Sequence, residues 1–547
     1  MGTQPAKEAH SASTNGAVEV DALIIGAGVA GLYQLYQLRN EGLRVLAVDT
    51  AADVGGTWYW NCYPGAKFDS ESYVYQYLFD ERLYKDWTWS ERYPSQPEIE
   101  RWMHYVTERL ELRRDIRFGT TVTSAVYDEA RGRWMVSTDR GGTFDTRFLI
   151  SCGGMLSAPL EKRFPGQERF SGRIFHTARW PREPLDLAGK RVGVVGVGAT
   201  GIQVIQTIAS EVAHLKVFVR TPQYVVPMKN PKYGPREEKA YKARFDELRD
   251  LLPRTHTGFE YEIKHRWADL TPEQRRAVLE ETYGDGSLRA WLGGFLEIFT
   301  EPEVSEQVSE FVREKMRARL KDPKLIEKLV PTDYGFGCRR VPLETRFLEV
   351  FHRDNVEAVS VRDNPIVEVV PEGIRLDDGT VHPLDVIVLA TGFDAGSGAL
   401  TRIDIRGRDG RSLRDDWSRD IRTALGMMVH GYPNMFMTGA PLAPSAALCN
   451  MTTCLQQQIE WITDCIRYMR GNGYTVIEPT ASFEEEWVRH HDEMANTTLI
   501  AKTNSWYTGT NVEGKPRRVL SYTAGVGTYR QKCTKVAEGG YQGFQMV

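Results

Sequence analysis

The sequence predicts an α/β fold with two βαβ nucleotide-binding units and a helical insertion. Residues 21–49 and 190–220 each consist of a short β-rich run, a glycine-rich turn, a helical stretch and a closing strand. Residues 229–331 are different in character, because Glu, Lys, Arg and Leu dominate and helical runs recur. Residues 395–547 mix loops and helices, and we expect them to fold back onto the first βαβ unit.

Composition and charge are those of an ordinary globular protein. Hydrophobic residues make up 41% of the 547 residues and charged residues 26%. The net charge of −4 and the lack of a long basic run argue against a nucleic-acid partner. No apolar stretch is long enough to span a bilayer, and the opening residues lack the apolar core of a secretion signal. We therefore expect no membrane association, a cytoplasmic location and a flexible N-terminal tail over residues 1–18.

The cysteines are predicted to be reduced thiols. They are odd in number, widely scattered and form no CxxC pair. This pattern argues against a structural metal site and against a redox-active dithiol. The seven positions are Cys62, Cys152, Cys338, Cys449, Cys454, Cys465 and Cys533.

The first glycine-rich turn has the spacing of a dinucleotide-binding fingerprint. Gly26, Gly28 and Gly31 form GxGxxG between a strand and a helix, so a pyrophosphate can approach the backbone at the helix N-terminus. Asp49 ends the next strand, 23 positions after Gly26, where a carboxylate can accept ribose hydroxyls. The alternative is a helix-packing turn that binds no ligand.

The second turn repeats this plan with a basic strand end. Gly196, Gly198 and Gly201 form the turn, and Thr200 is a further candidate contact. The closing strand ends in Arg220 and Thr221 instead of an acid, which favours the 2′-phosphate of NADPH over NADH. A solvated surface arginine is the alternative for Arg220.

Two Rossmann-like dinucleotide-binding domains, an acidic fingerprint first and a basic one second, indicate FAD and NADPH with hydride transfer between them. The predicted FAD-binding domain comprises residues 19–155 and 391–547, and the NADPH-binding domain residues 156–228 and 332–390. Disulfide reduction, simple dehydrogenation and monooxygenation are the competing outcomes. The lack of a CxxC dithiol disfavours the first.

Two longer motifs resemble one family. Residues 170–181, FSGRIFHTARWP, match every fixed position of the fingerprint FxGxxxHxxxWP of type I (class B) Baeyer–Villiger monooxygenases. Residues 55–69 resemble a second pattern of that family, from Gly55 through Trp58 and the Tyr63-Pro64-Gly65 run to Asp69. The resemblance implies oxidation of ketones to esters or lactones with O2 and NADPH, through a flavin C4a-peroxide.

The same resemblance implies that Arg340 is the catalytic arginine and that Asp69 orients it. The peroxide must stay anionic to attack a carbonyl, and its charge then moves to the oxygen of the tetrahedral intermediate. A guanidinium stabilises both anions without giving up its proton. An ordinary salt-bridged loop arginine is the alternative reading of Arg340.

Other candidate residues also follow from the resemblance. His176 is expected to act mainly through the linker between the domains, with direct proton chemistry or simple packing as alternatives. Arg339 is expected to join Arg220 at the 2′-phosphate or to be surface-exposed, and Trp506 to reach NADP or only to plug the cleft. Cofactor contacts are also expected for Thr57, Trp58, Asp69, Gln96 and Gln203.

One apolar segment is a candidate for the wall of the ketone pocket. Residues 442–451, rich in Ala, Pro, Leu and Met, are expected to form the apolar wall of the pocket. The chain departs from the family at Cys62 and Lys67, where arginine is usual or frequent, so the contacts of the Asp69 loop are in question. A flavin monooxygenase acting on amines or sulfides, and a non-catalytic dinucleotide-binding sensor, are the rivals. The sequence leaves the ketone and the oligomeric state open.

Overall fold

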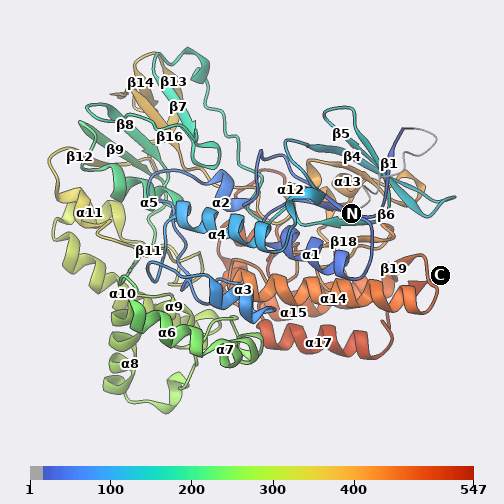
Figure 1. Cartoon of the computed structure of the whole chain (residues 1–547). Helices are drawn as coiled ribbons and strands as arrows, with labels where there is room; N and C mark the ends of the chain where they lie inside the picture. Colours follow the sequence, from blue (N-terminus) through green and yellow to red (C-terminus); the bar gives the residue numbers. More distant parts are fainter. Residues whose placement is uncertain (1–15) are drawn as a thin grey trace, which may run out of the picture.

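A computed structural model describes residues 16–547, and two sheets with parallel strands organise it (Figure 1). Strand β1 begins at Val18. Residues 1–15 of the predicted N-terminal tail therefore lie outside the described residues.

The first sheet has the strand order β17-β4-β5-β6-β1-β2-β3, and β18 pairs with β6. Strand β1 is parallel to both β2 and β6, whereas β4, β5 and β6 form an antiparallel meander. Two late strands, β17 and β18, join this sheet, so the C-terminal part folds back onto the first unit as predicted. The strands are β1 (Val18–Ile25), β2 (Val45–Val48), β3 (Ile116–Arg117), β4 (Val122–Asp128), β5 (Arg133–Thr138), β6 (Thr143–Ser151), β17 (Asp404–Arg406) and β18 (Met435–Met437).

The second sheet has the order β12-β9-β8-β16-β7, and all its strands are parallel. All four residues of β16 are buried, as expected for a central strand of a parallel sheet covered on both faces. A separate antiparallel sheet, β13-β14-β15, precedes β16 in the chain. The strands are β7 (Arg173–His176), β8 (Arg191–Val195), β9 (His214–Val219), β12 (Val356–Ser360), β13 (Ile366–Val370), β14 (Gly373–Leu376), β15 (Val381–Pro383) and β16 (Val386–Leu389).

Each sheet contains one strand that leads through a glycine turn into a helix. Helix α1 (Val29–Asn40) follows β1, and α5 (Ala199–Ile208) follows β8. The long helix α14 (Met451–Gly471) lies along α1 (Figure 1), and the Gln34 amide donates to the Thr463 hydroxyl at 3.1 Å between them. The predicted α/β class with two Rossmann-like domains is confirmed.

The segment between β10 (Val226–Pro227) and β11 (Leu343–Glu344) is helical, as predicted, and lies beneath the second sheet in Figure 1. Its apolar side chains join the main core; on α10 these include Val304, Val308 and Phe311. The helices are α6 (Pro235–Ala243), α7 (Phe245–Leu251), α8 (Pro272–Asp285), α9 (Arg289–Leu292), α10 (Pro302–Leu320) and α11 (Pro323–Leu329).

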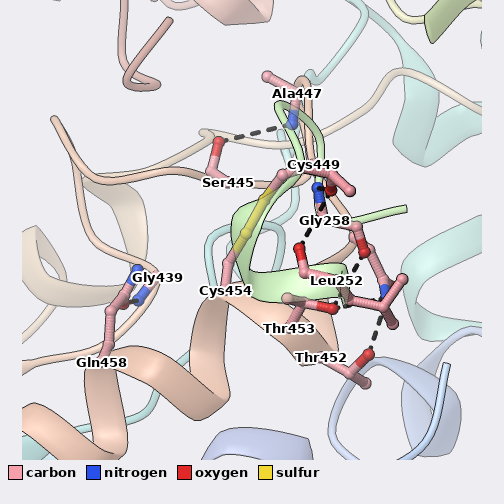
Figure 2. The surroundings of a disulfide bond; sticks show 12 residues. Leu252, Gly258, Gly439, Ser445, Ala447, Cys449, Thr452, Thr453, Cys454 and Gln458 are labelled. Carbon is pink, nitrogen blue, oxygen red and sulfur yellow. Dashed lines mark hydrogen bonds between the residues drawn. A yellow bond between two sulfur atoms is a disulfide. The ribbon is translucent and has the colours of Figure 1, made fainter. Parts of the chain in front are cut away.

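The prediction that all seven cysteines are free thiols is wrong for one pair. A disulfide joins Cys449 to Cys454 at the start of α14, with the two Cα atoms 7.0 Å apart (Figure 2). The chain turns into the helix at Asn450, whose backbone N–H donates to the Thr257 carbonyl, and this turn brings the two thiols together. The five other cysteines are free.

No helix among residues 16–547 combines the length and apolar character needed to cross a bilayer. Within the same range, no group of three or more His, Cys, Asp or Glu side chains is arranged to hold a metal ion.

Candidate active site

The first turn requires glycine, because side chains at Gly26 and Gly31 would collide with neighbouring backbone. Gly26 has φ +109°, and a Cβ there would lie 2.5 Å from the Cys152 carbonyl oxygen. A Cβ on Gly31 would collide with the Gly26 carbonyl, so helix α1 can pack directly on the turn. Gly28 caps α1 and approaches the backbone of Gly56. The backbone N–H groups at the start of α1 fit a pyrophosphate.

Asp49 lies beside this turn, immediately after β2. Its carboxylate accepts hydrogen bonds from the backbone N–H groups of Ala27 at 2.6 Å and Ala51 at 2.7 Å. Burial raises the pKa of Asp49, although both hydrogen bonds act in the opposite direction. The carboxylate thus lies where the fingerprint places the acceptor for ribose hydroxyls.

Three residues that are predicted to contact a cofactor lie close to one another. Helix α2 (Thr57–Trp60) carries Thr57 and Trp58, and the Trp58 indole donates to the Tyr75 hydroxyl at 3.1 Å. Gln96, the first residue of α4 (Gln96–Arg109), donates its side-chain amide to the Trp58 carbonyl. The structure therefore brings these three residues into one cluster.

The second turn repeats the same constraints. Gly196 has φ +106°, and a Cβ there would lie 2.6 Å from the Ala390 carbonyl oxygen. A Cβ on Gly201 would collide with the Gly196 carbonyl. Gly198 caps α5, and Thr200 is in its first turn. The same cradle for a dinucleotide therefore occurs twice.

Gln203, on α5, connects the two halves of the molecule, which are the part built on the first sheet and the part built on the second sheet. Its side chain accepts a hydrogen bond from the Tyr63 hydroxyl at 2.8 Å and donates to the Lys67 carbonyl at 2.9 Å. Both partners belong to the loop that leads to Asp69. Burial raises the pKa of Tyr63 to about 12, so its hydroxyl stays protonated and keeps donating.

Two arginines without acidic partners lie near the end of β9. Arg220 is exposed, and Arg339 is half-buried with its guanidinium 4.5 Å from the centroid of the Tyr334 ring. Arg339 Nε is buried and has no hydrogen-bond partner, and burial together with the charge of Arg220 lowers the pKa of Arg339. Within residues 16–547 neither arginine forms an ion pair with a carboxylate, and Thr221 is adjacent. Two unneutralised cations fit a phosphate.

Arg340 and Asp69 form the predicted pair. Arg340 Nη2 donates to Asp69 Oδ1 at 2.7 Å, and the side chains are 20% and 21% exposed. The Arg340 carbonyl accepts a hydrogen bond from the Gln223 side chain, which follows β9. The pair thus joins the Asp69 loop of the first half to the second half.

Sequence reasoning did not identify two aromatic residues beside this pair. The Arg340 guanidinium lies 5.0 Å from the centroid of the Trp291 ring. Tyr507 is buried, its pKa is raised by burial, and its hydroxyl donates to the Ala447 carbonyl at 2.8 Å. Tyr507 follows the predicted Trp506 directly, so that motif could have identified it, whereas no sequence signal marks Trp291.

The Tyr507 hydrogen bond also anchors the predicted pocket wall. Ala447 belongs to residues 442–451, most of which are buried. Trp506 is half-buried and packs edge-on against Tyr507, with the ring centroids 4.4 Å apart. The late segment around Trp506 therefore covers both the wall and the region of Arg340.

His176 lies elsewhere, at the end of β7. Its Nδ1 accepts a hydrogen bond from the Ala178 N–H at 3.1 Å, and its Nε2 is 3.2 Å from the Thr391 hydroxyl. Burial, and next the charge of Arg179, lower the pKa of His176. No hydrogen bond or ion pair joins His176 to Arg340 or Asp69 in the part of the chain that the structure describes. It fixes the joint between β7 and the turn after β16.

The two departures from the family pattern have clear positions. The Cys62 thiol lies 3.5 Å from the Trp180 carbonyl, within the linker fingerprint, and the Trp180 ring packs on Phe175. Lys67 Nζ is 4.0 Å from Glu91, and burial lowers the pKa of Lys67. The Asp69 loop is therefore held by these contacts and by Gln203.

Known proteins are similar to this chain over almost its whole length. The flavin-binding monooxygenase-like family matches residues 20–285. An acetone monooxygenase (methyl acetate-forming) from Gordonia sp. is 66% identical over 96% of this chain and 99% of its own. A Baeyer–Villiger monooxygenase from Pseudooceanicola batsensis is 41% identical over 96% and 95%, respectively. The crystal structure of OTEMO in complex with FAD and NADP has a TM-score of 0.93 and 39% identity, over 96% of this chain and 99% of its own.

Proposed function

Because this chain belongs to the type I Baeyer–Villiger monooxygenases, we propose that it inserts oxygen beside a ketone carbonyl and that Arg340 is the catalytic residue. The protein is an FAD- and NADPH-dependent monooxygenase that oxidises ketones to esters or lactones. The observation that carries the role of Arg340 is its ion pair with Asp69 at 2.7 Å.

The two glycine turns fit the two cofactors. We assign FAD to the turn at Gly26, Gly28 and Gly31, with Asp49 on its ribose, because the acid lies beside the first turn only. We assign NADPH to the turn at Gly196, Gly198 and Gly201, because Arg220 and Arg339 are free to bind a 2′-phosphate. The predicted boundaries of the two domains, at residues 155, 228, 332 and 390, are part of this proposal.

When bound and reduced by NADPH, FAD would supply the activated oxygen for this reaction. Arg340 then provides a fixed positive charge at which the developing negative charge of the ketone oxygen is stabilised. A guanidinium stays protonated at physiological pH, so it does not neutralise the attacking oxygen. Asp69 holds the guanidinium in place through one charge-assisted hydrogen bond.

The wall around Ala447 and the segment at Trp506 and Tyr507 exclude water from the site. We propose that the substrates are small aliphatic ketones, since the relative that is 66% identical is named for acetone. A cytoplasmic location is a further proposal. Cell fractionation tests that location.

The decisive experiment compares Arg340→Ala and Arg340→Lys with the unmodified enzyme. Each protein is purified, its flavin absorbance is recorded, and ester formation from acetone, other acyclic ketones and cyclic ketones is measured together with NADPH consumption. We expect both variants to bind FAD and oxidise NADPH but to form little or no ester. Ester formation close to that of the unmodified enzyme would remove Arg340 from the mechanism.

The same panel includes an amine and a sulfide, which test the rival class of flavin monooxygenases. Products identified by mass spectrometry separate the two functions. Oxygenation of the heteroatom substrates with no ester from any ketone would favour the rival.

A further inference from the structure

We infer that Trp291 is a positioning residue for Arg340. This inference deepens the proposed function and rests on the catalytic role of Arg340. Trp291 lies on the short helix α9 of the helical insertion, 49 positions before Arg340 in the sequence. The insertion thereby contributes directly to the geometry of the active site.

The first observation is the stacking of the charge on the ring. The Arg340 guanidinium carbon lies 5.0 Å from the centroid of the Trp291 ring, within the range of a cation–π interaction. Asp69 binds the same guanidinium at Nη2. Asp69 therefore holds one edge of the guanidinium through a hydrogen bond, and the Trp291 ring attracts the same group by a cation–π interaction. Together they restrict the position and the orientation of the guanidinium.

The second observation concerns the loop that carries Arg340. Gly337 has φ +87°, and a Cβ there would lie 2.6 Å from Trp291 Nε1. The loop backbone is therefore packed tightly against the indole, three residues before the guanidinium. Trp291 therefore contacts both the backbone of the loop that carries Arg340 and the Arg340 guanidinium.

The third observation is that the indole N–H of Trp291 donates no hydrogen bond to another residue among residues 16–547. Trp291 is 1% exposed, and its Nε1 has no hydrogen-bond partner within residues 16–547. Burying an N–H donor without a partner is unfavourable, and a phenylalanine or leucine would avoid that cost. A large aromatic face is what tryptophan adds at this position, because its ring attracts cations more strongly than other aromatic rings.

The test uses Trp291→Phe, which keeps an aromatic face, and Trp291→Leu, which removes it. Trp267→Leu is the matched control, because Trp267 lies in the same insertion with the Arg275 guanidinium 4.8 Å from its ring centroid. Within residues 16–547 it forms no hydrogen bond, aromatic contact or cation–π contact with the Arg340 loop. Flavin content and melting temperature report folding. Ester formed per NADPH consumed, hydrogen peroxide released, and the separate values of kcat and KM for ester formation report the position of Arg340.

We expect Trp291→Leu to lower kcat for ester formation roughly tenfold, with hydrogen peroxide replacing the missing ester and KM almost unchanged. Trp291→Phe should recover most of the coupling, and Trp267→Leu should leave the coupling as it is. Equal coupling in Trp291→Leu and the unmodified enzyme would overturn the inference. So would equal losses in the Phe and Leu variants, because the aromatic face would then not matter.

The Arg340→Ala enzyme separates this inference from the function it rests on. If Arg340→Ala abolishes ester formation while Trp291→Leu does not change it, only the inference fails. If Arg340→Ala still forms ester at the normal rate, the proposed catalytic role of Arg340 fails first, and the inference fails with it.

Discussion

Asp69 and Arg340 meet at 2.7 Å although 271 positions separate them in the chain. Asp69 is on a loop beside the first sheet, and Arg340 is on a loop that the Gln223 side chain holds at the end of β9. Gln203 joins the same two halves by binding Tyr63 and the Lys67 carbonyl. The position of the guanidinium therefore depends on how the two halves meet.

Asp69→Asn should lower ester formation by about 10- to 100-fold, because a charge-assisted hydrogen bond contributes roughly 1.5–3 kcal/mol. NADPH oxidation should continue, with hydrogen peroxide as the product. The measurement is ester formed per NADPH consumed. Asp404→Asn, which weakens the exposed pair of Asp404 with Arg406, is the control and should change little. Normal coupling in Asp69→Asn would show that the carboxylate does not position Arg340.

Arg220→Ala and Arg339→Ala should each raise KM for NADPH by about 10- to 100-fold and leave KM for NADH almost unchanged. A charge-assisted contact to a phosphate is worth roughly 1.5–3 kcal/mol, and NADH lacks the 2′-phosphate. Initial rates of flavin reduction with the two nucleotides provide the measurement. Arg375→Ala, at an arginine of β14 that pairs with Glu368, is the control. A parallel loss with both nucleotides would place these arginines away from the 2′-phosphate.

His176 should make the protein less stable in mild acid. Burial, and then the charge of Arg179, hold its pKa below the ordinary value of 6.5, although Glu161 acts in the opposite direction. The unfolded chain therefore takes up the proton at higher pH than the folded chain. Stability is fully present above about 6.5 and decreases as the pH falls from there towards the lowered pKa.

The measurement is the melting temperature between about pH 7.5 and pH 5.5 for the unmodified protein and for His176→Asn. The amide oxygen of Asn can accept the hydrogen bond from the Ala178 N–H without titrating. Three other histidines also have lowered pKa values, so only the difference between the two proteins reports His176. Parallel curves would mean that its protonation does not affect folding.

The local parts of this fold could be predicted from the sequence, because each glycine turn lies between a strand and a helix whose periodicity is contained in about 30 residues. Asp49 and Arg220 follow from the same signal, since they end the strands next to the turns. The Asp69–Arg340 contact has no local signal, and only the family resemblance indicated it. Trp291 could not be predicted at all, because its contact with Arg340 depends on how the insertion packs against the loop.

A count of free thiols tests whether Cys449 and Cys454 form a disulfide, as in the structure, or are both reduced, as the sequence predicts. Cysteine counting looks for CxxC spacing, whereas the turn at Asn450 brings together two cysteines five positions apart. The protein unfolded without reductant should show five titratable thiols, and seven after reduction. Cys454→Ser is the control and should show six thiols with or without reductant. Seven thiols before reduction would favour the free thiols that the sequence suggested.

Gly31→Ala should weaken FAD binding by about 10- to 100-fold, since overpacking costs roughly 1–3 kcal/mol. The added methyl group would collide with the Gly26 carbonyl and push α1 away from the turn that its N-terminus must face. The measurement is the ratio of flavin to protein after purification, followed by titration of the apoprotein with FAD. Gly284→Ala, on α8, is the control, because a Cβ there has open space around it and alanine favours the helix. If Gly31→Ala retains FAD as tightly as Gly284→Ala does, then close packing of α1 on the first turn is not what binds the flavin.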